Sequence, residues 1–262
     1  MTPLTVAAAF AGTSALAFSL RFHWWRPRRG GVPVLMYHQI APHRAGSALN
    51  AWRLPPEEFE RQLDHLVRRG LAGVTLRDLL DVPPRPGDRR VVLTFDDGYD
   101  GVRTAALPLL RARGFSATVF VVSGKLGGAN DWDGETPGDA LLSEEGLREL
   151  AAAGLEIGSH GATHRALPEL PDAELAAETR GSREVLERIV GLPVVSFCYP
   201  FGAASPRAAA AVREAGFRAA TVIRGGLVPD LDDPFRLRRV AVRGTRGLLD
   251  FRLALTRGRS TF

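Results

Sequence analysis

VVLTFDDG, residues 91–98, joins a short apolar run to two adjacent carboxylates. A short run rich in β-branched residues and closed by acidic residues and a glycine is typical of a buried strand. Asp96 and Asp97 follow it directly. One aspartate could simply cap the next helix. Two carboxylates that leave a buried strand need partners for their charge, so the pair indicates a site.

Similar apolar runs recur along the chain and are separated by amphipathic stretches. Further strands are predicted at 32–37, 117–122, 155–157, 194–199 and 219–223, with an edge or closing strand at 237–242. Helices are predicted at 56–69, 101–112, 143–153, 171–190 and 205–215. This alternation predicts an α/β fold with a mostly parallel sheet, either a barrel or an open doubly wound sheet. The Gly-rich stretch 124–139 is a long loop, a length that favours a functional role.

Composition limits the class of protein. A chain of 262 residues with 45% hydrophobic and 24% charged residues can bury the core of one domain, and it is not disordered, collagen-like or polytopic. The single cysteine, Cys198, excludes an intramolecular disulfide. The net charge of +5 comes from arginines at 1–30 and 236–262. Because this charge gathers at the ends, we expect no nucleic-acid partner.

The N-terminus holds a candidate targeting segment. Residues 4–20 carry no charge, and as a helix they would span about 26 Å, slightly less than a bilayer core. A small-residue cleavage site at 15–17 and the interfacial pair Trp24-Trp25 favour an exported or anchored protein. The missing positive charge before the run and the arginines after it oppose export. An Ala-rich helix packed on the domain is an alternative interpretation of the same segment. We expect a segment at 1–30, a catalytic domain at 31–262, and a membrane-anchored or secreted protein, with a cytoplasmic one as the alternative.

Two histidines follow the predicted strand at 155–157. His160 and His164 stand four residues apart in SHGATH. On one turn or in a compact loop, two such imidazoles can share a metal, although a single HxxxH is also compatible with two unrelated polar side chains. An aspartate and two histidines form a common ligand set for a divalent ion. The second aspartate would then be free to act as a base.

Two further strand ends carry polar groups. His38 follows the strand at 32–37, where a lone histidine is more often an ordinary polar side chain. SFCYPFG, residues 196–202, ends in a turn that could present a backbone N–H to a developing oxyanion or could be an ordinary connection. In a barrel of parallel strands all these groups would lie on one rim.

TFDDG, HGATH and CYPFG, in this order and spacing, resemble the motifs of the polysaccharide deacetylase family of carbohydrate esterases, the NodB-homology type. VLMYH is similar to the branch that includes deacetylases of biofilm poly-N-acetylglucosamine. The resemblance covers roughly residues 32–245. It implies a distorted (β/α) barrel that holds a divalent metal, most often zinc, and an N-acetylated polysaccharide as substrate.

The resemblance also implies roles for individual residues. It assigns the metal to Asp97, His160 and His164, the general base to Asp96, the general acid to His38, and an oxyanion-binding N–H to Phe201. Two positions depart from the commoner family pattern. Cys198 stands where an arginine often precedes the Pro-Tyr turn, and no histidine follows His164, so the usual C-terminal Leu-x-His is absent. His38 is therefore the remaining imidazole for the acid.

The function expected is metal-assisted removal of N-acetyl groups from a hexosamine polysaccharide. An O-acetyl esterase acting on xylan or a similar glycan would use the same groups. A non-haem iron oxygenase also uses one carboxylate and two histidines, although it needs no base such as Asp96. A non-catalytic glycan-binding module with a vestigial site is the remaining alternative.

Overall fold

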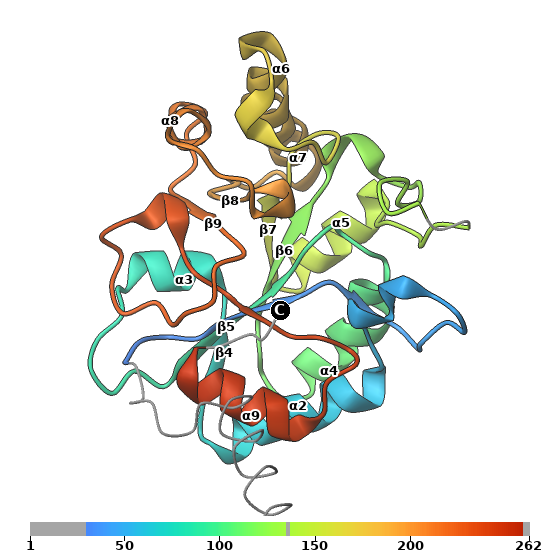
Figure 1. Cartoon of the computed structure of the whole chain (residues 1–262), viewed down its shortest axis with the longest axis vertical. Helices are drawn as coiled ribbons and strands as arrows, with labels where there is room; N and C mark the ends of the chain where they lie inside the picture. The colour runs from blue at the N-terminus through green and yellow to red at the C-terminus, as the bar shows by residue number, and fades with distance from the viewer. Residues whose placement is uncertain (1–29, 135–136, 259–262) are drawn as a thin grey trace, which may run out of the picture.

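The computed structural model describes residues 30–134 and 137–258, and its centre is a curled sheet of parallel strands (Figure 1). The strand order is β10-β1-β5-β6-β7-β8-β9, and the short β4 (Ala72–Val74) pairs with the start of β5. The bounds are Val34–Tyr37 for β1, Arg90–Phe95 for β5, Thr118–Val121 for β6, Glu156–Ser159 for β7, Ser196–Cys198 for β8, Ala219–Thr221 for β9 and Val240–Ala241 for β10.

The C-terminal part of the sheet closes it on itself. Thr221 at the end of β9 forms a parallel bridge with Leu237, and the Val222 N–H donates to the Leu237 carbonyl oxygen at 3.0 Å. A few residues later Val240 pairs with Leu35 of β1. Residues 237–241 thus connect the two edges of the sheet. The distorted (β/α) barrel is confirmed, and the open doubly wound sheet is excluded.

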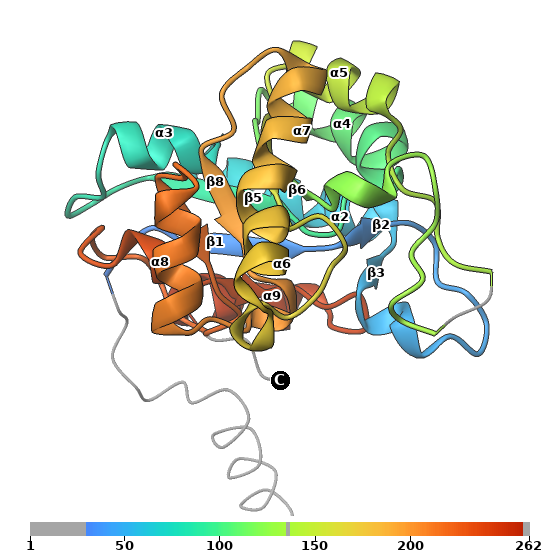
Figure 2. The same ribbon diagram turned by 90° about the horizontal axis from the view of Figure 1, so that it is seen from above.

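Helices cover the outside of the sheet (Figure 2). They are α2 (Pro56–Arg68), α3 (Leu76–Asp81), α4 (Leu107–Arg111), α5 (Glu144–Ala152), α6 (Asp172–Ala176), α7 (Ser182–Val190), α8 (Pro206–Glu214) and α9 (Leu248–Arg257). The hydroxyl groups of Ser143 and Ser205 cap α5 and α8 by accepting from backbone N–H groups of the first turn. All five predicted helices are present. Two of them contain a π-helical turn, at η2 (Val102–Ala106) and η5 (Ala177–Gly181).

The elements that the sequence did not predict are short or peripheral. They are the two-residue pair β2 (Gln39–Ile40) and β3 (Arg53–Leu54), the strand β4, and the helices α3 and α9. Two or three residues give no periodicity to detect. The pairing of β2 with β3 nevertheless matters, because it joins the segment after His38 to Arg53 and Leu54.

The central strands are buried on both faces. Every residue of β1, β6, β7 and β8 is buried, and so are five of the six residues of β5. Such continuous apolar runs are expected for a parallel sheet covered by crossover helices. Within residues 30–134 and 137–258, no helix is both long and apolar enough to cross a bilayer. The targeting segment predicted at 4–20 lies outside the described residues.

Candidate active site

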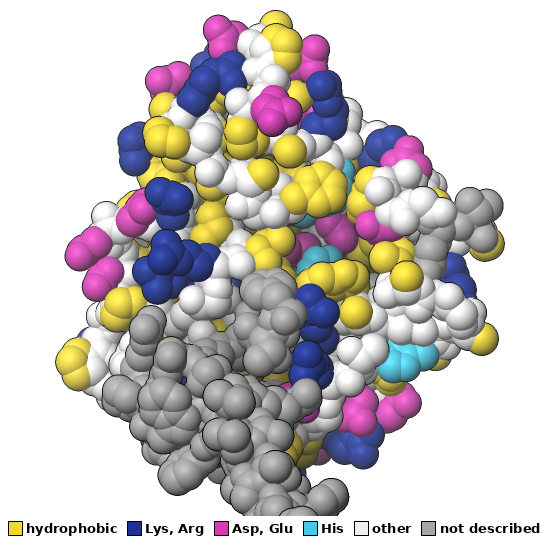
Figure 3. All heavy atoms as spheres, in the orientation of Figure 1, with side chains coloured by type: hydrophobic (Ala, Val, Ile, Leu, Met, Phe, Trp, Pro, Cys, Tyr) yellow, Lys and Arg dark blue, Asp and Glu magenta, His cyan; other side chains and the backbone are white. Residues whose placement is uncertain are grey.

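The carboxyl ends of β1, β5, β7 and β8 meet at one rim of the barrel. A cavity of about 140 Å³ lies there, and its lining includes the side chains of all six predicted site residues, namely His38, Asp96, Asp97, His160, His164 and Phe201. Figure 3 shows histidine and acidic side chains at the bottom of a hollow that hydrophobic side chains border. The structure therefore brings together groups that are up to 163 positions apart in the sequence.

Asp97 and the two histidines of HGATH form a compact cluster. The Nε2 atoms of His160 and His164 each lie 3.3 Å from the same oxygen, Oδ1 of Asp97. All three residues are buried, and their ligand atoms lie within 4.8 Å of one another. Burial opposes ionisation of Asp97, but hydrogen bonds with both imidazoles outweigh it and hold the pKa of the carboxyl well below its usual range. One carboxylate and two imidazole nitrogens that converge on one point are donors of the kind that bind a divalent metal.

The backbone at this cluster is unusual. Asp97, His164 and Phe201 have φ values of 72°, 62° and 57°, and they are the non-glycine residues with positive φ in the described part of the chain. Left-handed backbone is costly for such side chains and is found mostly where function requires it. All three residues line the same cavity. The strain is thus confined to the rim where the polar groups converge.

Hydrogen bonds orient His160 and the loop that follows it. His160 Nδ1 lies 2.7 Å from the carbonyl oxygen of Cys198, so the Nδ1–H donates there, and Nε2 is the atom that would bind a metal in place of its proton. The buried carboxylate of Glu178 accepts from the N–H groups of Ala162 and Thr163 at 2.7 and 3.0 Å. A Cβ at Gly161 (φ +82°) would lie 2.6 Å from Glu178 Oε2, which explains the glycine.

Asp96 has a different partner. Arg239, just before β10, donates from Nη1 to Asp96 Oδ1 at 2.6 Å and from Nη2 to Oδ2 at 2.7 Å. The arginine side chain is fully buried and also contacts the Cys198 sulfur at 3.1 Å. Burial alone would raise the pKa of Asp96, but Arg239 lowers it below its usual value. Arg239 therefore keeps the carboxylate ionised and fixes its plane.

Aromatic rings enclose the cluster. Trp132, from the long loop before α5, stacks on the His164 ring at 4.4 Å, and Phe201 meets the same ring edge-on at 4.7 Å. The His38 ring, which lines the same cavity, lies 4.5 Å from Trp52. Burial lowers the pKa of His38 below its ordinary value, so its imidazole is mostly neutral at neutral pH.

Three residues that shape this site did not stand out in the sequence. Arg239 lies more than 140 positions from Asp96, Glu178 is one of many helical glutamates, and Trp132 gives no short-range pattern. The one available signal was Cys198, which stands where an arginine often precedes the Pro-Tyr turn. Of the other histidines, His43 bonds to the Arg53 carbonyl oxygen and His65 lies on α2, and both are absent from the cavity lining.

A parallel barrel with two adjacent buried carboxylates and two imidazoles at its rim is an arrangement that could hold a divalent metal and activate water. The chain belongs to the polysaccharide deacetylase family, whose sequence model matches residues 84–220. This match includes Asp96, Asp97 and both histidines of HGATH, whereas His38 and Arg239 lie outside it.

Individual relatives extend the likeness over most of the chain. YxkH of Bacillus subtilis (strain 168), whose name assigns it to the same family, is 27% identical over 214 residues, which cover 80% of this chain and 71% of YxkH. The polysaccharide deacetylase BC0361 from Bacillus cereus has 25% identity and a TM-score of 0.72, with 87% of this chain and 69% of that one covered. IcaB from Ammonifex degensii has 25% identity and a TM-score of 0.74, with 89% and 99% covered.

Proposed function

We propose that this chain removes N-acetyl groups from a hexosamine-containing polysaccharide, with a zinc ion held by Asp97, His160 and His164. The observation that supports this most is the pair of Nε2 atoms at equal distances from one Asp97 oxygen, beside a second, ionised carboxylate. When bound, such an ion supplies Lewis-acid chemistry, which acidifies water and polarises a carbonyl group. The donor set fits it, because His160 Nδ1 is bonded to the Cys198 carbonyl oxygen and the Nε2 atoms of both histidines lie 3.3 Å from Asp97 Oδ1.

Different residues of the chain would then carry out the separate proton transfers. Asp96, ionised and fixed in its plane by Arg239, takes a proton from the attacking water. The backbone N–H of Phe201 donates to the carbonyl oxygen as negative charge develops on it. His38 lines the cavity and delivers a proton to the departing amine nitrogen. The C–N bond breaks, and acetate and a free amino sugar are the products.

The test is acetate release from N-acetylglucosamine oligomers, measured with and without a chelator and after added zinc. We expect release that the chelator abolishes and zinc restores. Acetylated xylan, assayed in parallel, separates N- from O-deacetylation. Turnover of xylan alone would favour the O-acetyl esterase, whereas zinc binding without turnover of either polymer would favour a glycan-binding module. Dependence on ferrous iron and oxygen would favour an oxygenase.

We further propose that residues 31–262 form the catalytic domain and that the apolar segment 4–20 delivers or anchors it outside the cytoplasm, where a polysaccharide substrate would be met. Cell fractionation of a tagged full-length chain tests this. Recovery of the intact chain from the cytosolic fraction would contradict it.

A further inference from the structure

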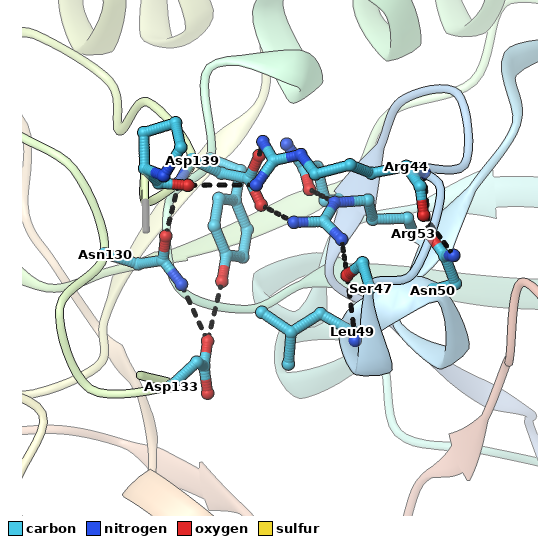
Figure 4. A network of polar contacts seen from close by, with 11 residues as sticks. Arg44, Ser47, Leu49, Asn50, Arg53, Asn130, Asp133 and Asp139 are labelled. Carbon is cyan, nitrogen blue, oxygen red and sulfur yellow. Dashed lines mark hydrogen bonds and ion pairs between the residues drawn. The ribbon is translucent and has the colours of Figure 1, made fainter. Parts of the chain in front are cut away.

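One wall of the catalytic cavity is built from two segments that a buried ion pair holds together. Arg53 of β3 is 2% exposed, and its guanidinium pairs with the buried Asp139 at the far end of the long loop before α5. Arg44 donates to the other Asp139 oxygen at 2.7 Å. Figure 4 shows these arginines reaching across to the loop. The loop is thereby fixed to the segment that follows His38.

Asn130, in the middle of the loop, is bonded to the same Asp139. Its backbone N–H donates to the Asp139 carbonyl oxygen at 3.0 Å, and its side-chain oxygen accepts from the Asp139 N–H. A Cβ at Gly138 would lie 2.1 Å from the Asn130 carbonyl oxygen, so the two strands of the loop approach each other at a distance that only glycine allows. Hydrogen bonds and close packing therefore hold Asn130 against Gly138 and Asp139.

Asn130 in turn holds the side chain of Asp133. Asn130 Nδ2 donates to Asp133 Oδ2 at 2.7 Å, and the hydroxyl of the buried Tyr99 donates to the same oxygen at 3.3 Å (Figure 4). Tyr99 itself lies two residues after the metal-ligand candidate Asp97. Two donors on one oxygen fix the direction of the carboxylate.

The second Asp133 oxygen, Oδ1, has no hydrogen-bond partner among the described residues, and the side chain lines the catalytic cavity. Next to it stands Trp132, stacked on His164, and Trp52 lines the same cavity. Asp133 is exposed to solvent, so this oxygen can accept a hydrogen bond from a hydroxyl group that approaches from outside. Aromatic rings beside it suit the apolar faces of a sugar ring, while the polar edge of the ring carries hydroxyls.

We propose that Asp133 is a specificity-determining residue that accepts a hydrogen bond from a hydroxyl of the hexosamine unit undergoing deacetylation. This inference rests on the proposed function, because it needs a sugar ring beside the reacting acetamide. It assigns to Asp133 recognition of the sugar and no part in the chemistry of the acetyl group. The ion pair of Arg53 with Asp139 keeps the loop, and with it the Asp133 carboxylate, in place.

Asp133→Asn tests the proposal. The amide oxygen can still accept from Asn130 and Tyr99, but an NH₂ group replaces the open oxygen. We expect kcat/KM for N-acetylglucosamine oligomers to fall at least tenfold, mainly through KM, and oligomer affinity measured by calorimetry to fall by a similar factor. Hydrolysis of an aryl acetate, which has no sugar ring, and zinc stoichiometry should stay as in the wild type.

Two matched variants control for loop damage. Asp131→Asn changes an exposed carboxylate of the same loop that pairs with Lys125, and it should leave all readings unchanged. Tyr99→Phe removes one of the two donors to Asp133 and should raise KM by a smaller factor. Equal losses of Asp133→Asn on oligomer and aryl acetate, or unchanged oligomer affinity, would overturn the proposal. If the wild type binds oligomers without cleaving them, the proposed reaction fails, and the affinity comparison still decides the role of Asp133.

Discussion

The two ends of β7 place buried titratable side chains in opposite surroundings. Glu156 begins the strand and His160 follows its last residue, so four positions separate them. Among the described residues, the hydrogen-bond donors to Glu156 are neutral groups, namely the hydroxyls of Thr118 and Ser196 and the Arg77 backbone N–H. His160 faces the ionised Asp97. At one end of the strand the Glu156 carboxyl group has its hydrogen bonds filled by neutral groups, whereas at the other end the His160 imidazole lies beside an ionised carboxylate.

The same difference separates the two buried carboxyl groups, Glu156 and Asp96. Burial raises the pKa of Glu156, because hydrogen bonds from neutral groups offset it only in part. Burial acts on Asp96 as well, yet the fully buried guanidinium of Arg239 lowers its pKa below the usual value. The comparison shows that burial alone does not activate a carboxylate. A buried countercharge at the carboxyl end of the sheet does so, which agrees with the division of barrel ends into a catalytic and a structural one.

The largest effect should come from the metal-ligand candidates. Asp97→Ala or His164→Ala removes one of three donors, so we expect zinc content to fall from about one ion per chain to near zero and acetate release to disappear. Elemental analysis of the purified variants after dialysis measures this. Glu156→Gln, at the other end of β7, should keep its zinc. Stoichiometric zinc in Asp97→Ala would show that the assigned ligands are wrong.

Asp96→Asn comes next. It keeps the side-chain shape and leaves Asp97, His160 and His164 intact, so zinc should stay bound while turnover falls by about 10²–10⁴-fold through loss of the base. Thermal melting checks that Arg239, now beside a neutral amide, has not unfolded the barrel. Loss of zinc with a normal melting temperature would mean that the roles of the two neighbouring aspartates are exchanged.

His38→Ala should separate two kinds of substrate. An amine leaves poorly unless it is protonated, so hydrolysis of the N-acetyl group should fall by about 10²-fold or more, whereas an aryl acetate should lose much less. Because the pKa of His38 is lowered by burial, the protonated fraction falls as pH rises through that lowered value. Wild-type amide turnover should therefore decline over this range, and the decline should be absent from the variant. Equal losses on both substrates would assign His38 a structural or positioning role.

The sequence predicted the barrel well because its central strands are continuous apolar runs with a residue pattern of their own. Every predicted strand has a counterpart, although several are shorter, since hydrogen-bonded pairing ends before the apolar run does. Strands β2 and β3 were missed because two residues carry no pattern. Their pairing depends on contacts with distant parts of the chain, including the ion pair of Arg53 with Asp139.

The site was predictable where its residues follow a strand directly. His38, Asp96 and His160 are each adjacent to the last residue of a strand, and Asp97 is one residue further, so parallel pairing is enough to bring them to one rim. Arg239 was not predictable in the same way. It reaches Asp96 only because residues 237–241 close the sheet between β9 and β1, which is a property of the whole fold.

The smallest effect on activity should come from Glu156→Gln, and its effect on stability should depend on pH. The folded-state pKa of Glu156 is raised above its unfolded value, so the folded chain holds a proton more tightly there. The stability contribution of the protonated group is complete below the ordinary carboxyl pKa of about 4.3, and it is lost as pH rises through the folded-state pKa.

Glutamine can replace the protonated form, because its oxygen can accept from Arg77 N–H and Thr118 while its NH₂ donates to the Ser196 hydroxyl. The melting temperature of the wild type should therefore drop relative to that of Glu156→Gln as pH rises from 4 to 8, with about 2–4 °C for each kcal/mol. Zinc content and acetate release should match the wild type at every pH where both are folded. A melting-temperature difference that does not vary with pH would mean that Glu156 ionises as easily in the folded chain as in the unfolded one. A fall in acetate release would show that the two ends of β7 are not independent.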